Sequence, residues 1–348
     1  MTITFMNFIK NLTNLPFLIT TVLISGVMFV NGCTDAPNSI ATCISTRCLT
    51  PKKALTLSVI FNFLGVLIMT FLNATVAQTI FNIVDFGNNV HSALIALCSS
   101  LISIVLWSIM AWHLGLPTSE SHALIAGLSG SAIALQKGIS GINFGEWKKV
   151  IYGLIIINIL AFFCGLVITR IIERICINMD RRKTNKFFHK LQIISAAAMA
   201  FMHGAQDGQK FIGVFLIGAM LASGSMGSGF AVPIWLTVYC SIFMGLGAII
   251  GGKRIIKTVG MKMVKFEKYQ GASADIASTV CLLGSSLMGI PLSTTHVKTT
   301  AIMGVGASKR LSNVNWNVAK NMLLTWVCTF PGCGLMGYIS TMIFEKIF

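Results

Sequence analysis

The chain reads NGCTDAPNS from Asn31 to Ser39, a polar stretch with a proline that directly follows a long apolar run. A related stretch, HGAQDGQK, extends from His203 to Lys210, and Asp207 lies 172 positions after Asp35. Glycine, proline and charged residues interrupt membrane helices when they occur inside apolar sequence. We therefore expect a broken helix around each of these two aspartates.

A second motif also occurs twice. GLPTSESH runs from Gly115 to His122 and GIPLSTTH from Gly289 to His296, so that the two histidines are 174 positions apart. Two motifs that keep their order and spacing in each half of a chain indicate an internal duplication. In duplicated membrane proteins, interrupted helices from the two halves converge near the middle of the bilayer.

The composition is that of a membrane protein. Hydrophobic residues make up 55% of the 348 residues and charged residues only 10%, whereas a soluble domain is roughly 25% charged. The mean hydropathy is +0.80. Apolar stretches near the ~20 residues that a spanning helix needs recur at 15–30, 54–76, 92–110, 150–172, 193–201 with 211–221, 232–250, 277–290 and 322–344.

The net charge of +16 comes from basic residues in short loops, at 47–53, 170–190, 253–268 and 309–310. Such loops mark the cytoplasmic side of a membrane protein. Contact with anionic lipid headgroups explains the charge, and no nucleic-acid-binding motif accompanies it. The ten cysteines contain no Cys-x-x-Cys pair, and the sequence indicates neither a cofactor nor a structural metal site.

The charged loops predict an all-α polytopic membrane protein made of two inverted repeats. We expect the first repeat at 1–178, a basic cytoplasmic linker at 179–190 and the second repeat at 191–348. Each repeat has three spanning helices and one re-entrant helical hairpin, at 89–136 and at 270–307. Because each repeat crosses the membrane an odd number of times, the two repeats have opposite orientations in the membrane.

Each hairpin contains hydroxyl side chains directly after its proline. Serine and threonine are favoured at helix starts, where free amides and the helix dipole attract anions. Two such starts facing each other would hold a tetrahedral oxyanion. The predicted substrate-binding residues are Ser119, Glu120, Ser121, Lys210, Ser293, Thr294 and Thr295.

The two aspartates supply the chemistry of a cation site. A carboxylate within the membrane is costly and usually marks an ion path or a buried pair. Oxygen donors suit a hard cation such as sodium, whereas a titrating aspartate would instead serve proton coupling. The predicted cation-binding residues are Thr34, Asp35, Asn38, Gln206 and Asp207, and the alternative is that the aspartates only brace the helix breaks.

These two duplicated motifs resemble those of the inorganic phosphate transporter (PiT) family, over about residues 18–345. The resemblance implies secondary transport of inorganic phosphate, driven by a sodium or a proton gradient, and no enzymatic activity. It also implies a homodimer in the plasma membrane, for a bacterial chain the cytoplasmic membrane. Asp35 and Asp207 would be the signature aspartates.

Several residues depart from the family pattern. Thr34 and Gln206 precede the aspartates where the family usually has Asn, Lys210 replaces an Asn, and Glu120 replaces a Thr. We predict that Glu120 and Lys210 are near neighbours, with the ammonium where a coupling cation would otherwise bind. Alternatively, both contact phosphate directly. We expect Lys298, a further additional base, to extend toward the cytoplasmic face.

Other functions remain open at this stage. A sulfate permease of the same family is the main alternative, since both ions are tetrahedral, and a passive anion channel is the second. Phosphate carries protons near pH 7, so the acceptor carboxylate of Glu120 favours phosphate. The histidines beside the motifs, His122, His203 and His296, lack the partners of a hydrolase. We expect them to be hydrogen-bonded helix-face residues, and the alternative is a proton relay.

Overall fold

The computed structural model describes residues 4–87, 89–114, 119–223, 230–262, 267–314 and 316–347. Within these ranges the regular structure is helical, apart from an isolated bridge between Val84 and Ile142. The helices are α1 Phe5–Asn11, α2 Leu15–Thr34, α3 Ala36–Ser39, α4 Ala41–Ser45, α5 Pro51–Leu72, α6 Thr75–Phe81, α7 Val90–Leu114, α8 Glu120–Leu135, α9 Phe144–Cys176, α10 Arg181–Ala222, α11 Ile234–Lys262, α12 Lys268–Leu287, α13 Thr294–Lys309 and α14 Trp316–Ile347, with short 3-10 turns at Ile139–Gly141 and Leu311–Asn313.

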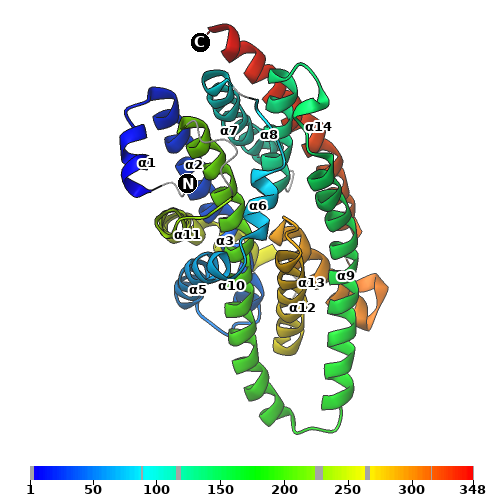
Figure 1. Cartoon of the computed structure of the whole chain (residues 1–348). Helices are drawn as coiled ribbons and strands as arrows, with labels where there is room; N and C mark the ends of the chain where they lie inside the picture. The colour runs from blue at the N-terminus through cyan, green and yellow to red at the C-terminus, as the bar shows by residue number, and fades with distance from the viewer. Residues whose placement is uncertain are drawn as a thin grey trace.

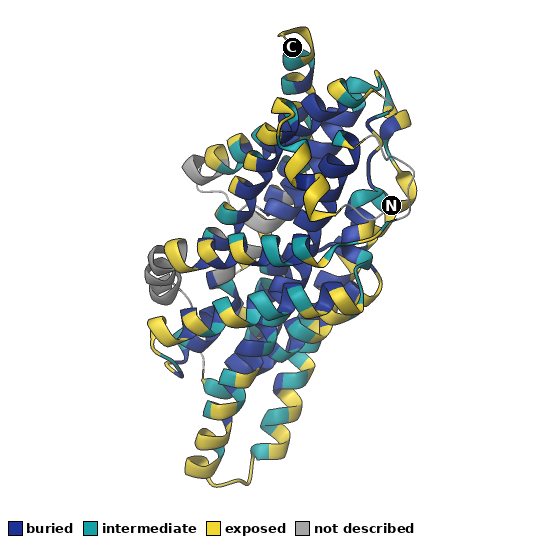
Figure 2. Ribbon diagram, turned by 60° about the vertical axis from the view of Figure 1, so that its left-hand side comes forward, coloured by how far each residue is buried: buried dark blue, intermediate teal, exposed yellow. Residues whose placement is uncertain are grey.

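Five segments in the described ranges are long and apolar enough to cross a membrane: Leu15–Ser39, Pro51–Leu72, Val90–Met110, Phe144–Cys176 and Leu323–Ile347. Helix α9 shows how such a helix meets lipid. Its exposed large side chains recur every fourth residue, at Ile151, Ile155, Ile159, Phe163 and Val167, and therefore lie along one face. Figure 2 shows buried residues through the middle of the molecule and exposed ones along the outer helix faces. The chain is an all-helical membrane protein, as predicted.

The two halves of the chain pack on each other through equivalent pairs of helices. Helix α2 packs on α11, and α10 packs on α5, so the first long helix of each half contacts the second of the other. Likewise α9 packs on α13, and α14 packs on α8. Each of the helices α8 and α13, which follow the two GxP motifs, thus lies against the last long helix of the opposite half.

Glycines allow these helices to approach closely, and they occur at equivalent contacts. A Cβ built at Gly32 in α2 would lie 2.2 Å from the carbonyl oxygen of Met244 in α11. A Cβ at Gly204 in α10 would lie 2.2 Å from the carbonyl oxygen of Asn62 in α5. Small residues at such crossings let helix backbones touch in membrane proteins. The glycines of the two polar motifs therefore have a packing role.

The helix around the first aspartate is broken, as predicted, but the helix around the second is not. Helix α2 ends at Thr34, and α3 begins after Asp35 with Pro37 in its first turn. Proline lacks an amide proton and cannot continue the hydrogen-bond ladder of the preceding helix. In contrast, α10 is continuous through Asp207. The predicted interruption at 203–210 is wrong, because glycine without proline is tolerated there by close packing.

The predicted linker at 179–190 is also largely helical. Only a short turn separates α9 from α10, and residues 181–190 form the first turns of α10. Figure 1 shows α9 and α10 extending together past the other helices to this turn. The basic residues of the segment therefore lie on the projecting end of two long helices.

Candidate functional site

The starts of α8 and α13 lie side by side in the interior. In α8, the hydroxyl of Ser119 accepts from the His122 amide at 3.4 Å, and in α13 the hydroxyl of Ser293 accepts from the His296 amide at 3.4 Å. The two imidazole rings are 5.2 Å apart between centroids. Both helices thus begin with the serine cap that the sequence predicted, and their first turns face each other.

Lys210 extends from α10 into this junction and is almost fully buried, at 1% exposure. Its Nζ atom donates to Asp207 Oδ1 at 2.7 Å and to Ser121 Oγ at 2.7 Å, and it also contacts the carbonyl oxygen of Leu292. The ammonium therefore connects α10 with the first turn of α8 through Ser121 and with the segment before α13 through Leu292. A buried charge requires such partners, since leaving it unpaired costs several kcal/mol.

Asp207 is the carboxylate partner of Lys210 and is itself 1% exposed. Nε2 of His203, one turn earlier in α10, lies 3.4 Å from Asp207 Oδ2, and the side chain of Asn31 also hydrogen-bonds the carboxylate. Nδ1 of His203 lies 2.8 Å from the side-chain oxygen of Asn62 in α5. The second aspartate is thus held among α2, α5 and α10.

Asp35 lies at the helix break and faces the start of α13. The hydroxyl of Thr295 hydrogen-bonds its carboxylate, and the side-chain amide of Asn38 donates to the same hydroxyl at 3.2 Å. Asp35 is also close enough to Glu120 and Asp207 for the three carboxylates to interact electrostatically. Three acidic groups and one buried ammonium thus share one region of the interior.

Gln206 contacts the end of α12 and the segment before α13. Its amide nitrogen donates to Ser285 Oγ at 3.0 Å and Ser286 Oγ at 2.9 Å, and its amide oxygen accepts from the Leu292 nitrogen at 3.2 Å. These contacts hold Gln206 beside the start of α13. Nearby, the Thr294 hydroxyl is buried and has no hydrogen-bond partner among the described residues.

The structure thus brings together most of the residues that the motifs predicted: Asp35, Asn38, Ser119, Glu120, Ser121, Gln206, Asp207, Lys210, Ser293, Thr294 and Thr295. The side chain of Thr34 and residues 115–118, between α7 and α8, lie outside the described part. Sequence reasoning did not assign Asn31 or Asn62, which are ordinary asparagines in apolar helices. Their proximity to Asp207 and His203 becomes visible only in three dimensions.

Lys298 differs from expectation. It does not extend to the cytoplasmic face: its side chain is 3% exposed, and Nζ lies 3.0 Å from Asp275 Oδ1. Asp275 is 0% exposed. Because a buried carboxylate is costly without a partner of opposite charge, it holds the Lys298 ammonium in the interior. A second buried ion pair therefore joins α12 to α13.

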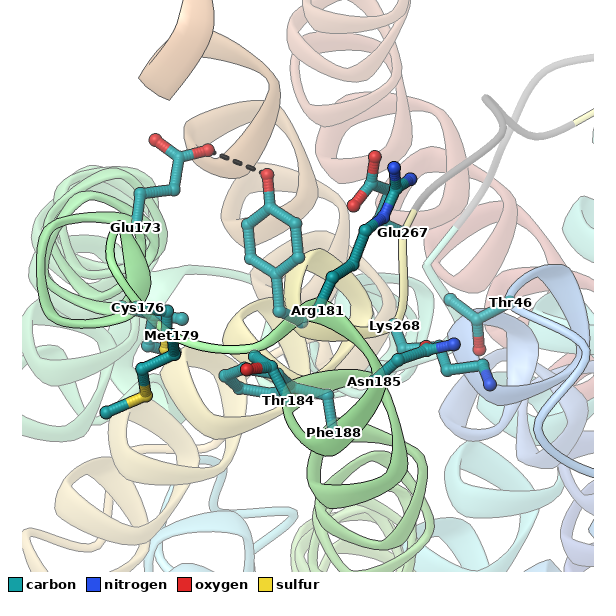
Figure 3. Close-up of a pocket in the computed structure, with 12 residues that line it drawn as sticks. Thr46, Glu173, Cys176, Met179, Arg181, Thr184, Asn185, Phe188, Glu267 and Lys268 are labelled. Atoms are coloured by element: carbon teal, nitrogen blue, oxygen red, sulfur yellow. Dashed lines mark hydrogen bonds between the residues drawn. The ribbon is translucent and has the colours of Figure 1, made fainter.

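A cavity of about 580 Å³ lies elsewhere, where α9, α10 and the start of α12 meet. Figure 3 shows its lining, with Glu173 accepting a hydrogen bond from Tyr269 at 2.8 Å. Burial and the nearby carboxylate raise the pKa of the Tyr269 phenol above its usual range, so that it remains the donor. None of the predicted site residues lines this cavity.

Buried charges that converge inside a bundle of membrane-length helices are typical of membrane transport proteins. Comparison with known proteins specifies the class further. Residues 31–337 match the phosphate transporter family. The chain belongs to this family, which confirms the resemblance of its motifs.

Individual relatives agree. The chain is 37% identical to a "Probable low-affinity inorganic phosphate transporter" of Bacillus subtilis (strain 168), covering 92% of this chain and 94% of that protein. A protein of the same description from Rhizobium meliloti (strain 1021) is 35% identical, over 88% and 90% of the two chains. A solved structure titled "The sodium-dependent phosphate transporter" shares the fold, with a TM-score of 0.86 and 22% identity over 96% and 100%.

Proposed function

We propose that the chain is a secondary active transporter that takes up inorganic phosphate across the plasma membrane. The observation that carries this proposal is the meeting of the α8 and α13 starts with Lys210. Two serine-capped helix starts supply amide and hydroxyl donors, and the ammonium supplies a positive charge. This is a donor set for a tetrahedral oxyanion.

The proposed phosphate ligands are the residues at the two helix starts and the lysine: Ser119, Glu120, Ser121, Lys210, Ser293, Thr294 and Thr295. The buried Thr294 hydroxyl supports this assignment because it lacks a partner among the described residues. Glu120 would accept a hydrogen bond from a protonated phosphate oxygen. Sulfate has no proton to offer at neutral pH, so this acceptor favours phosphate over sulfate.

The local charges also support coupling to a cation. Asp35 interacts electrostatically with Glu120 and with Asp207, and Lys210 is the ammonium that pairs with Asp207. A phosphate anion entering beside three carboxylates would be repelled in a region of low dielectric constant. Sodium ions or protons that bind with phosphate would remove this repulsion. A passive anion channel would have no reason to place carboxylates beside its permeant ion.

We propose that Asp35, with Asn38 and Thr34, provides the principal coupling site, and that Asp207 and Gln206 complete it. We further propose that the equivalent helix pairs arise from inverted repeats with two re-entrant hairpins. Helices α8 and α13 have 16 residues each, about 24 Å, which is less than the ~30 Å hydrocarbon core. A homodimer is the assembly that the family resemblance implies.

Reconstituted proteoliposomes test the transport function directly. Radiolabelled phosphate uptake is measured with an inward sodium gradient, with an inward proton gradient, with both and with neither, and sulfate is added as a competitor. We expect accumulation above the external concentration under at least one gradient and weak competition by sulfate. Equilibration without accumulation would indicate a channel, and equal competition by sulfate would contradict phosphate selectivity.

A further inference from the structure

The ion pair between Lys298 and Asp275 is separate from the proposed phosphate site. Their atoms Nζ and Oδ1 are 3.0 Å apart, and both side chains are almost completely buried. Burying two charges costs several kcal/mol per ion before their attraction is counted, and apolar residues of similar size often do as well or better. The burial of Lys298 and Asp275 is therefore not explained by a gain in stability alone.

Polar atoms from three further helices contact the ammonium and its carboxylate. Thr42 in α4 donates to both oxygens of Asp275, at 2.8 Å each. The carbonyl oxygen of Ser39, the last residue of α3, accepts from Lys298. The Gln192 amide in α10 donates to Asp275 Oδ2 at 2.7 Å. The pair thus ties the broken helix to the second hairpin and to α10.

The same set of atoms has the chemistry of a cation site. A carboxylate, a hydroxyl oxygen and a backbone carbonyl are ligands that hard cations prefer. The Oε1 atom of Gln192, whose amide nitrogen contacts Asp275, is buried and has no hydrogen-bond partner among the described residues. In the described part of the chain, the positive charge paired with this carboxylate is the ammonium of Lys298.

A cation from outside would have a short path to this position. Thr46 lines the cavity of Figure 3, and its hydroxyl donates to the carbonyl oxygen of Thr42 at 2.9 Å. The cavity lining therefore includes a residue one helical turn after Thr42, which itself contacts Asp275.

We propose that Asp275, Thr42, Gln192 and the Ser39 carbonyl form a site for a monovalent cation, which the chain fills with its own Lys298 ammonium. The junction between the broken helix and the second hairpin then needs no bound sodium. This inference concerns a site apart from the phosphate ligands, and it does not depend on which anion is transported.

The test is thermal unfolding of the purified full-length protein in detergent, in sodium chloride or in choline chloride at equal ionic strength. Lys298→Ala leaves Asp275 without its ammonium and opens space for an ion. We expect this variant to melt lower than the parent in choline, and sodium to raise its melting temperature saturably by about 5 °C or more. The sodium response of Lys298→Ala should exceed that of the parent, whose only response comes from any sodium bound at the proposed coupling site.

Three variants control this measurement. Lys309→Ala removes an exposed lysine from the end of the same helix and should respond to sodium as the parent does. Asp275→Asn combined with Lys298→Ala removes the whole ion pair and should also respond no more than the parent. Lys298→Ser serves if Lys298→Ala cannot be purified, since serine is also neutral and short enough to leave space for an ion, and it should show the same gain of sodium response.

Sodium-insensitive melting of both single Lys298 variants would overturn the proposal, as would an equal sodium response in the double variant or in the parent. Because unfolding is measured without phosphate, these outcomes are independent of phosphate transport. The two proposals can therefore fail separately. If the parent protein does not accumulate phosphate in liposomes but sodium stabilises the Lys298→Ala variant, the proposed function is refuted and the cation site is supported.

Discussion

The two aspartate segments share a sequence motif but differ in local structure. Asp35 lies in a break between α2 and α3, beside the hydroxyl of Thr295, whereas Asp207 lies in the continuous helix α10 and pairs with Lys210 at 2.7 Å. One carboxylate has an ammonium of the chain as its partner, and the other has neutral hydrogen-bond donors. We infer that the two copies have diverged in role, with Asp35 left for an exchangeable cation or proton and Asp207 tied to the anion-binding lysine.

The largest expected effect comes from neutralising either aspartate. Asp35→Asn and Asp207→Asn should each lower gradient-driven phosphate uptake in proteoliposomes to about a tenth or less, because a buried membrane carboxylate is costly unless it is used. Asp180→Asn, at the exposed turn before α10, is the matched control and should transport normally. Near-normal uptake by either motif variant would remove that residue from the site.

The two variants should differ in stability. Asp207→Asn leaves the buried Lys210 without its carboxylate, so its melting temperature should fall by about 5 °C or more. Asp35→Asn removes a carboxylate that lies near two others, so its melting temperature should stay the same or rise. If Asp35→Asn melts at a lower temperature than Asp207→Asn, the pairing of Lys210 with Asp207 does not account for the difference between the two aspartate segments.

Glu120 and Lys210 are tested by a double-mutant cycle with Glu120→Thr and Lys210→Asn. Each single change should lower uptake at least about tenfold, and the double change should recover activity or increase its dependence on sodium if the two charges are coupled. Additive losses with unchanged ion dependence would show that they act independently. The structural basis for coupling between the two residues is that Lys210 donates a hydrogen bond to Ser121, which directly follows Glu120 in α8.

Packing predicts smaller, matched effects in the two halves. Gly32→Ala in α2 and Gly204→Ala in α10 would each place a Cβ 2.2 Å from a carbonyl oxygen of the facing helix, at a cost of about 1–3 kcal/mol. Thermal unfolding should show similar losses for the two variants. Gly26→Ala, where no atom lies within 4 Å, should be neutral. A loss in only one of the two variants would argue against equivalent packing.

Topology is tested by labelling single cysteines in a cysteine-free background. Residues 140 and 225 should react from outside and residue 262 from the cytoplasm if the halves are inverted repeats with re-entrant hairpins. Ser140 lies in the short 3-10 turn after α8 and is exposed, so it is open to reagent. Cytoplasmic labelling at residue 140 would contradict the inverted arrangement.

The sequence predicted the membrane fold and most of the polar residues that meet at the starts of α8 and α13. Both depend on patterns that can be recognised in the sequence itself. Apolar length predicted the helices, and the repeated motifs predicted which polar residues meet. The continuity of α10 could not be predicted in this way, because Gly204 is accommodated by its close approach to Asn62 in α5. The pairing of Lys298 with Asp275 also escaped prediction, since the two residues belong to different helices and no spacing rule relates them.

Phosphate exchange tests the different roles of the two aspartates most directly. Liposomes loaded with unlabelled phosphate are placed in labelled phosphate with no ion gradient, and exchange is compared with gradient-driven accumulation. We predict that Asp35→Asn, which mimics a neutralised coupling site, keeps exchange but loses accumulation, whereas Asp207→Asn loses both because Lys210 is no longer positioned for the anion. Exchange that is lost in Asp35→Asn and kept in Asp207→Asn, or affected equally in the two, would contradict this account.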